Sequence, residues 1–192
     1  WVIDNGMLKP YSPITLFFRI FEKFNYRQAD IIGIQSPANK AWFDTATHFR
    51  YKTTLLYNWV TVKHNARETA FRKNYNLTDK IIYFYGGNIG HAQDMMNLVR
   101  LAESMKDYDK AHFVFLGAGD EFDLVVKQKE KRNLDNITIL PPVTQSEFEK
   151  ILTTIDVGLF SLHRDHQTHN FPGKLLGYMN CKKPILGSVN PD

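Results

Sequence analysis

The sequence predicts an α/β protein whose parallel, Rossmann-like sheet is covered by helices on both faces. From residue 81 onward, short runs of β-branched and aromatic residues alternate with stretches whose apolar residues recur at helical spacing. Turns that contain glycine follow three of the expected strands. Strands that alternate with helices form βαβ units, and these units build parallel sheets that bind ligands at the carboxyl ends of the strands. The pattern therefore predicts both the fold and the edge where a ligand binds.

The first expected strand covers residues 81–85 and runs into the turn Gly86-Gly87-Asn88-Ile89-Gly90. A helix is expected over residues 92–106, because its apolar residues fall on one face. These residues are Met95, Leu98, Val99, Ala102 and Met105.

The second expected strand covers residues 113–116 and stops at the turn Gly117-Ala118-Gly119-Asp120. We expect Asp120 to cap a helix over residues 121–132, since an aspartate at this position stabilises a helix by about 1 kcal/mol. The third strand covers residues 137–140.

The last part of the chain continues the alternation. A helix over residues 144–154 begins with a Thr-x-x-Glu capping box. A fourth strand covers residues 157–161, a helix covers residues 171–181, and a fifth strand covers residues 184–188. These five strands and their helices belong to one sheet domain.

The first 60 residues follow a different pattern. We expect a helix over residues 10–29, a strand over residues 30–35 and a second helix over residues 37–47, and residues 55–60 then lead into the alternating part. A domain boundary near Val60 gives two domains, at residues 1–60 and 61–192.

The first helix combines aromatic residues with Arg19, Lys23 and Arg27, so it is amphipathic with a basic side. Such a helix can lie on an anionic membrane face. Packing of its aromatic side within a domain is the more frequent arrangement.

The composition indicates a globular protein, with 43% hydrophobic and 23% charged residues. A formal net charge of +4 suits an anionic ligand or membrane face, but no clustered basic stripe indicates a nucleic-acid partner. The single cysteine, Cys181, excludes a disulfide within the chain and fits a reducing compartment. With no apolar run of about 18 residues and no cleavable signal sequence, we expect a cytoplasmic protein, with optional peripheral contact at the inner face of the cell membrane.

The segment His169-Asn170-Phe171-Pro172-Gly173-Lys174 predicts an anion site. Pro172 and Gly173 stand where a helix is expected to begin, so free backbone N–H groups and the positive helix end face outward. Lys174 adds a cation, and the common biological anion at such a place is phosphate. The alternative is an ordinary connection between strand and helix with a surface lysine.

Several segments together, in this order, carry a resemblance to a known family. They are Tyr57-Asn58-Trp59-Val60, Gly87-Asn88-Ile89-Gly90 with Gln93, Gly117-Ala118-Gly119-Asp120-Glu121, Asn170-Phe171-Pro172-Gly173-Lys174, and Lys183-Pro184-Ile185-Leu186. The chain resembles the group 1 nucleotide-sugar glycosyltransferases, which are retaining enzymes of GT-B architecture. It is most similar to the bacterial O-antigen and capsule type, which transfers N-acetylated 6-deoxyhexosamines to lipid-linked saccharides.

The resemblance implies that residues 61–192 are the donor half of a GT-B fold, which we expect to continue past Asp192. Residues 1–60 would be the C-terminal remnant of the acceptor domain and the linker. The donor would be a nucleoside diphosphate sugar, with a UDP-N-acetylated sugar as the expected case. Because most of the acceptor domain is absent, this chain alone is expected to be inactive.

The resemblance also implies the site. Pro142 and Val143 would flank the base, and the amides of Gly173 and Lys174 would receive the diphosphate. Gly87 and Gly90 would allow its close approach. The full expected donor-binding set is Gly87, Asn88, Gly90, Gln93, Gly117, Gly119, Glu121, Pro142, Val143, Asn170, Phe171, Pro172, Gly173 and Lys174. The expected catalytic residues are Lys174 and His169.

Two departures from the family pattern affect these roles. Many relatives carry two glutamates, for the sugar and the ribose, where this chain has His169 and Gly177, so the ribose contact is assigned to Glu121. Many relatives also carry an arginine and a lysine where this chain has Asn88 and Gln93. Lys174 is therefore expected to be the main cation for the leaving diphosphate.

Histidines near this site are further candidates. The loop over residues 163–169 is expected to reach the sugar or the phosphates. His91 stands just past the first glycine turn, and it is a candidate either for packing or for contact with donor or acceptor. His163, His166 and His169 also suggest zinc, but no cysteine accompanies them and the spacing is not that of a zinc helix. No metal and no other cofactor is expected, because the mechanism implied is charge stabilisation and positioning during attack from the side of the leaving group.

Two other functions remain open from the sequence. A non-catalytic or dinucleotide-binding Rossmann module would use Gly117-Ala118-Gly119, but that turn lacks the third glycine and follows the second strand. A nucleotide-sugar epimerase would share the architecture and would need acid and base groups across a cleft.

Overall fold

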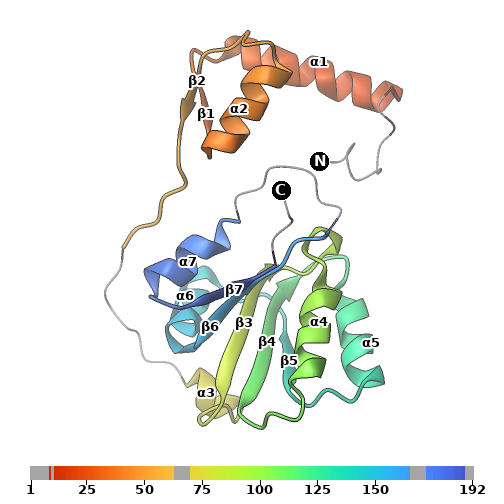
Figure 1. Cartoon of the computed structure of the whole chain (residues 1–192), viewed down its shortest axis with the longest axis vertical. Coiled ribbons are helices and arrows are strands. Elements are labelled where there is room, and N and C mark those ends of the chain that lie inside the picture. Colours follow the sequence, from red (N-terminus) through yellow and green to blue (C-terminus); the bar gives the residue numbers. More distant parts are fainter. Residues whose placement is uncertain (1–8, 10, 63–69, 165–171, 189–192) are drawn as a thin grey trace. The chain divides into compact units, whose positions relative to one another are not determined.

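The chain folds into two compact units (Figure 1), one formed by the described residues up to Trp59 and the other by those from Val60 onward. The computed structural model describes residues 9, 11–62, 70–164 and 172–188. Among these residues, no helix combines the length and the apolar character that crossing a bilayer requires.

The first unit contains two helices and a pair of parallel strands. Its elements are α1 (Pro13–Gln28), β1 (Ile32–Ile34), α2 (Pro37–Ala46) and β2 (Thr53–Leu55). Both helices begin with a proline after a serine, and the hydroxyl oxygens of Ser12 and Ser36 accept hydrogen bonds from backbone N–H groups three residues later. The predicted strand over residues 30–35 is shorter, and β2 was not predicted.

The two helices meet through aromatic rings. The ring of Tyr26 on α1 lies 5.2 Å from that of Phe43 on α2 and 5.5 Å from that of Tyr51, measured between centroids. The other aromatic residues of α1 are more than half exposed, so the expected packing of its aromatic side is not found among the described residues. These exposed residues are Phe17, Phe18, Phe21 and Phe24.

The second unit is built on a five-stranded parallel sheet with the strand order β5-β4-β3-β6-β7. The strands are β3 (Ile81–Asn88), β4 (Ala111–Ala118), β5 (Ile137–Leu140), β6 (Val157–Phe160) and β7 (Ile185–Gly187). All seven residues from Ala111 to Gly117 are buried, as expected for a strand covered on both faces.

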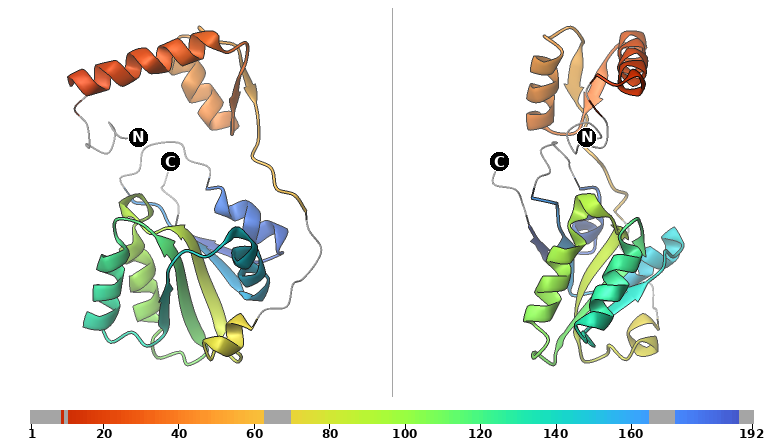
Figure 2. Two further views of the ribbon diagram at one scale, coloured as in Figure 1. Left: turned by 180° about the vertical axis from the view of Figure 1, so that it is seen from behind. Right: turned by 90° about the vertical axis from the view of Figure 1, so that its right-hand side faces the viewer.

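Helices cover both faces of this sheet, which confirms the predicted fold (Figure 2). They are α4 (Met95–Ser104) and α5 (Phe122–Lys131) on one face, and α6 (Gln145–Thr154) and α7 (Lys174–Asn180) on the other. Each face has its own apolar core: Tyr85 and Phe115 pack with α4 and α5, while Phe84 and Leu116 pack with α6 and α7.

Three helix starts differ from the prediction. A short 3-10 turn, η1 (His91–Gln93), precedes α4, whose N-cap is Asp94 in a left-handed conformation. The expected cap by Asp120 is wrong: the N-cap of α5 is Glu121, without a side-chain capping bond. Helix α7 begins at Lys174, three residues later than predicted.

The order in which the chain adds strands to the sheet reverses between β3 and β6. From β3 the chain adds β4 and then β5 on one side, and it then returns to add β6 and β7 on the other side of β3. In open α/β sheets, ligands bind at the carboxyl ends of the strands at such a switch point. The loops that follow β3 and β6 therefore define where a ligand is expected.

The opposite end of the sheet is fastened by Arg72 of α3 (Phe71–Asn74). Its guanidinium donates to the backbone oxygens of Thr154 at 2.7 Å and Lys80 at 2.8 Å, and it pairs with the Asp156 carboxylate at 2.5 Å. The same carboxylate oxygen accepts the N–H of Ile82 at 2.7 Å. One side chain thus joins α3 to the starts of β3 and β6.

Candidate functional site

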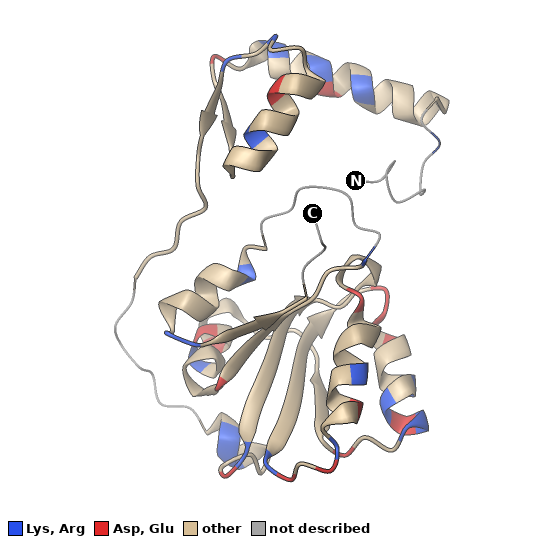
Figure 3. Ribbon diagram, viewed as in Figure 1, with Lys and Arg blue, Asp and Glu red and all other residues tan. Residues whose placement is uncertain are grey.

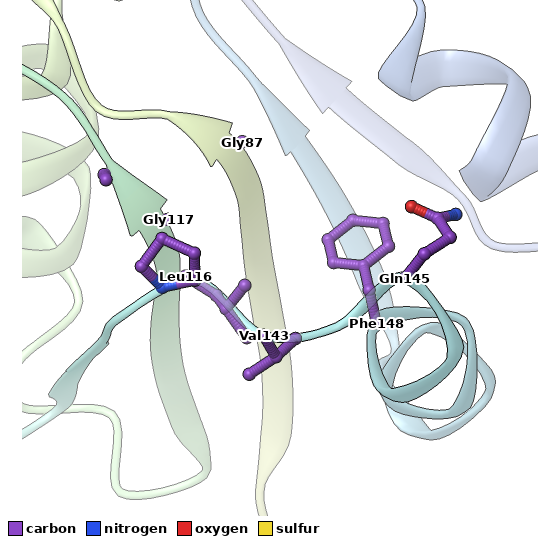
Figure 4. A pocket seen from close by; sticks show the side chains of 8 residues that line it. Gly87, Leu116, Gly117, Val143, Gln145 and Phe148 are labelled. Atoms are coloured by element: carbon purple, nitrogen blue, oxygen red, sulfur yellow. The ribbon is translucent and has the colours of Figure 1, made fainter.

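A cleft of about 360 Å³ opens at the carboxyl ends of β3, β4 and β5, beside the start of α6 (Figure 4). It is lined by Gly87, Leu116, Gly117, Ala118, Pro142, Val143, Gln145 and Phe148. Four residues of the predicted donor set thus lie around one cleft.

Gln145 and Phe148 of α6 form the wall opposite the strand ends, as Figure 4 shows. Neither residue was predicted from the sequence to belong to the site. Their position at the start of the helix that follows Pro142 and Val143 was a usable signal.

Two glycines form the floor of the cleft because their backbones meet. Gly87 and Gly117 have φ angles of +134° and +154°, which residues with side chains rarely adopt. A Cβ on Gly117 would overlap the carbonyl oxygen of Gly87, and one on Gly119 would overlap that of Ile89. Gly117 and Gly119 were predicted to face the donor, but their contacts show that they first allow the ends of β3 and β4 to approach.

Lys174 reaches this floor from the start of α7. Its ammonium nitrogen lies 3.6 Å from the centroid of the Tyr85 ring, and a Cβ on Gly87 would lie 3.6 Å from the same nitrogen. Among the described residues, no carboxylate pairs with it. Burial lowers the pKa of Lys174 to about 7, because removing an ammonium from water disfavours its charged form.

Tyr178 holds α7 in the position that directs Lys174 inward. Its side chain is buried, and its hydroxyl donates to the carbonyl oxygens of Phe84 and Leu159, at 3.2 and 3.1 Å. These oxygens belong to β3 and β6, the two strands of the switch point. The anchor therefore lies one helical turn after the lysine that it positions.

The two amides predicted to replace the family's cations bind each other. The Asn88 side-chain nitrogen donates to the Gln93 side-chain oxygen at 2.8 Å. Gly90 lies between them, where a Cβ would lie 2.5 Å from the carboxylate of Asp120. This hydrogen bond closes the loop after β3.

Glu121 contacts a histidine in this structure. One of its carboxylate oxygens lies 3.4 Å from Nδ1 of His91, and the other is buried with no hydrogen-bond partner among the described residues. The His91 ring also packs against that of His163, with centroids 4.6 Å apart. The structure thus brings together side chains from the loops after β3, β4 and β6.

Some predicted residues do not line the cleft or are not described by the structure. Pro172 and Gly173 precede α7, and Gly173 is exposed, so that a Cβ added there would meet no described atom within 4 Å. His169, Asn170 and Phe171 lie outside the described residues, as does His166. In the part of the chain that is described, no three His, Cys, Asp or Glu side chains are arranged to hold a metal ion.

The sequence matches the family described as Glycosyl transferases group 1 over residues 66–191, well over half of the chain. None of the curated protein sequences matches it.

Solved structures share the fold. Anabaena Alr3699/HepE in complex with UDP and glucose has a TM-score of 0.71 at 13% identity, over 94% of this chain and 49% of that one. WaaG, a glycosyltransferase involved in lipopolysaccharide biosynthesis, has a TM-score of 0.68 at 12% identity, over 93% of this chain and 50% of that one. A TarM mutant of S. aureus in a complex that includes UDP has a TM-score of 0.66 at 17% identity, over 89% of this chain and 33% of that one. At these identities the likeness shows the fold alone, and this chain spans between a third and a half of their length.

Proposed function

This chain belongs to the group 1 glycosyltransferase family, and on that premise we propose that its second unit binds the nucleoside diphosphate of a sugar donor, with UDP as the nucleotide. The observation that carries the proposal is the ammonium of Lys174 beside Gly87, at the switch point and next to the cleft. A cation in that position suits a diphosphate that lies across the end of β3.

The cleft supports a base next to that diphosphate. Pro142, Val143 and Phe148 all line it, so a flat heterocycle bound there would contact apolar atoms. Polar contacts to the base edge can come from Gln145. The nucleotide would then run from the cleft over Gly87 toward Lys174.

Lys174 is a strong candidate for binding phosphate because it is already withdrawn from water. A hydrogen bond to a charged group contributes about 1.5–3 kcal/mol, and a helix terminus about 0.3–1 kcal/mol. Helix α7 has only seven residues, so we assign the larger part of phosphate binding to the lysine.

The proposed reaction is transfer with retention of configuration. As the bond between sugar and diphosphate breaks, negative charge grows on the leaving oxygen, and Lys174 would stabilise it. The acceptor hydroxyl would attack from the side of the leaving group, where positioning of both reactants supplies much of the rate. No metal or other cofactor is part of this proposal.

We further propose a UDP-N-acetylated sugar as donor and a lipid-linked saccharide of O-antigen or capsule synthesis as acceptor, on the resemblance of the sequence segments. Helix α1 supports a peripheral contact with an anionic membrane. It carries Arg19, Lys23 and Arg27, so the basic positions in Figure 3 lie in the part of the helix from Arg19 onward, and exposed aromatic residues lie between them.

Calorimetric titration with UDP, UMP and NAD⁺ tests the core of the proposal. We expect UDP to bind more tightly than UMP, because only UDP carries the second phosphate, and we expect no binding of NAD⁺. Binding of NAD⁺ but not UDP would overturn the proposal in favour of a dinucleotide module. Thermal shifts with a panel of nucleotide sugars would then identify the donor, since a ligand raises the melting temperature according to its affinity.

A further inference from the structure

A second group of titratable side chains lies at the switch point, and the proposed function does not yet use it. His91 stands in η1 after β3, Glu121 follows β4, and His163 follows β6. His91 is the central residue, because the Glu121 carboxylate and the His163 ring both contact it. The loops that carry them are themselves joined by backbone hydrogen bonds, from Glu121 to Ile89 and from His163 to Ala92, both at 3.0 Å.

This arrangement fixes the imidazole of His91 while leaving it accessible. Its side chain is 59% exposed, although Glu121 contacts Nδ1 and the His163 ring lies against its face. With Nδ1 directed to the carboxylate, Nε2 is the nitrogen left for a ligand. A positioned ring with one accessible nitrogen is suited to bind an oxygen atom of a substrate.

The sequence of the loop after β3 favours a phosphate oxygen as that ligand. Residues 88–94 contain no lysine or arginine, and the amides of Asn88 and Gln93 bind each other. His91 is the side chain of this loop that can carry a positive charge. It stands four residues after Gly87, so the two Cα atoms are at most about 14 Å apart.

We propose that His91, positioned by Glu121 and His163, binds the distal phosphate of the nucleoside diphosphate together with Lys174. The proposal rests on the proposed function, because it takes the diphosphate to lie across the end of β3. His91 would be a second diphosphate-binding group, and Glu121 would act through it. This role for Glu121 differs from the ribose contact that the family resemblance implies.

The charges around His91 are mixed. The loop after β4 contributes Glu121 and Asp120, the loop after β6 contributes His163, and the end of η1 contributes Asp94, which contacts Arg100 of α4. Histidine is the side chain whose charge changes near physiological pH, so UDP binding is measured at two pH values.

The first test compares wild-type protein with His91→Gln in titrations with UDP and UMP at pH 6.0 and 8.5. Glutamine keeps a polar side chain but cannot carry the charge. We expect the variant to bind UDP about tenfold more weakly at pH 6.0. UMP affinity should be unchanged at both values. The ionisation of UDP and of Lys174 affects both proteins, so it cancels in their ratio.

His48→Gln is the matched control, because it makes the same change at an exposed histidine of the first unit. It should leave both affinities unchanged. Melting temperatures of both variants should equal that of the wild type, which separates a binding effect from misfolding.

The second test is a double-mutant cycle with Glu121→Gln. If Glu121 acts through His91, the Glu121→Gln substitution weakens UDP binding in the wild-type background. In the His91→Gln background the same substitution has little further effect. If Glu121 binds the ribose, the substitution weakens the binding of UMP and of UDP equally in both backgrounds. That result would overturn the positioning role of Glu121.

The outcomes separate the two proposals. Wild-type protein that does not bind UDP at either pH would overturn the proposed function. Wild-type protein that binds UDP, with a His91→Gln variant of equal affinity at both pH values, would overturn the role of His91 alone. An equal loss for UMP and UDP would also overturn it, because the contact would not be to the distal phosphate.

Discussion

The ammonium nitrogen of Lys174 lies 3.6 Å from the centroid of the Tyr85 ring, at the end of the strand that carries Gly87. The phenol of Tyr85 is itself fixed, because its hydroxyl donates to the carbonyl oxygen of Asn88 at 2.5 Å, and burial raises its pKa. The ring stays neutral and offers its electron-rich face to the lysine. The side chain of Lys174 is thus in place for an anion before one arrives.

Replacing Lys174 with methionine should weaken UDP binding at least fivefold. Methionine keeps an unbranched apolar stem over the Tyr85 ring but removes the charge, which contributes about 1.5–3 kcal/mol in a hydrogen bond to phosphate. Lys174→Ala should weaken binding by at least as much. Lys127→Ala, an exposed position on α5, is the control. Isothermal titration measures all three, and equal affinity of wild type and Lys174→Met would remove Lys174 from the phosphate site.

UDP affinity should fall as the pH rises from 7 to 9. Burial lowers the pKa of Lys174 to about 7 in the free protein, so the amine is mostly neutral above that value. A bound diphosphate favours the ammonium, so binding above pH 7 requires the uptake of a proton. Affinity then drops by up to about tenfold per pH unit. Titrations of the wild type should show this slope and those of Lys174→Met should not; a flat wild-type profile would contradict the assignment.

Gly117→Ala should destabilise the second unit by about 2 kcal/mol or more. The residue has a φ of +154°, and its new Cβ would overlap the backbone of Gly87, which cannot move aside without separating β3 from β4. Gly173→Ala is the matched control, since Gly173 has a φ of −58° and open space around it, and it should change stability by less than about 1 kcal/mol. Urea denaturation measures both, and similar midpoints for the two variants would refute the packing role of Gly117.

Arg72→Ala should also destabilise this unit by about 2 kcal/mol. It removes hydrogen bonds to four backbone oxygens, and the Asp156 carboxylate loses its charged partner while the N–H of Ile82 stays in place. Arg100→Ala, which removes exposed contacts of 3.5 Å to Asp94 and 3.4 Å to Asn97, should change the free energy of unfolding by less than about 0.5 kcal/mol. If denaturant curves of the two variants coincide, the fastening by Arg72 contributes little.

The 192-residue chain by itself should transfer no sugar. It spans between a third and a half of the length of the solved structures that share its fold, so groups that bind the acceptor are expected to lie outside it. The measurement is release of UDP from nucleotide sugars in the presence of saccharide acceptors. Turnover above that of a Lys174→Met control would contradict this expectation.

The sequence predicted the fold well where local signals agree. Strand β5 was placed to the residue and α6 to within one residue, because a compact apolar run and a capping box mark them. Strand β2 was missed because it is three residues long, and its pairing with β1 joins segments about 20 residues apart in the chain. Asp94 could not be recognised as a cap, since its left-handed backbone depends on the turn before it.

The site was predicted in part for the same reason. Pro142 and Val143 follow a strand that the sequence locates, so their place at the cleft could be expected. The contact of Lys174 with Tyr85 could not, because it depends on how Tyr178 seats α7 on the sheet. The contact between His91 and Glu121 joins residues 30 positions apart, and no spacing rule indicates it.

The packed glycines at the ends of β3 and β4 restrict how this site can change during evolution. Gly117 cannot accept a side chain without pushing Gly87 away, so drift at either position would damage the sheet before it altered specificity. If the cleft binds the proposed nucleotide, new preferences would have to arise by substitutions at Val143, Gln145 and Phe148, which line it.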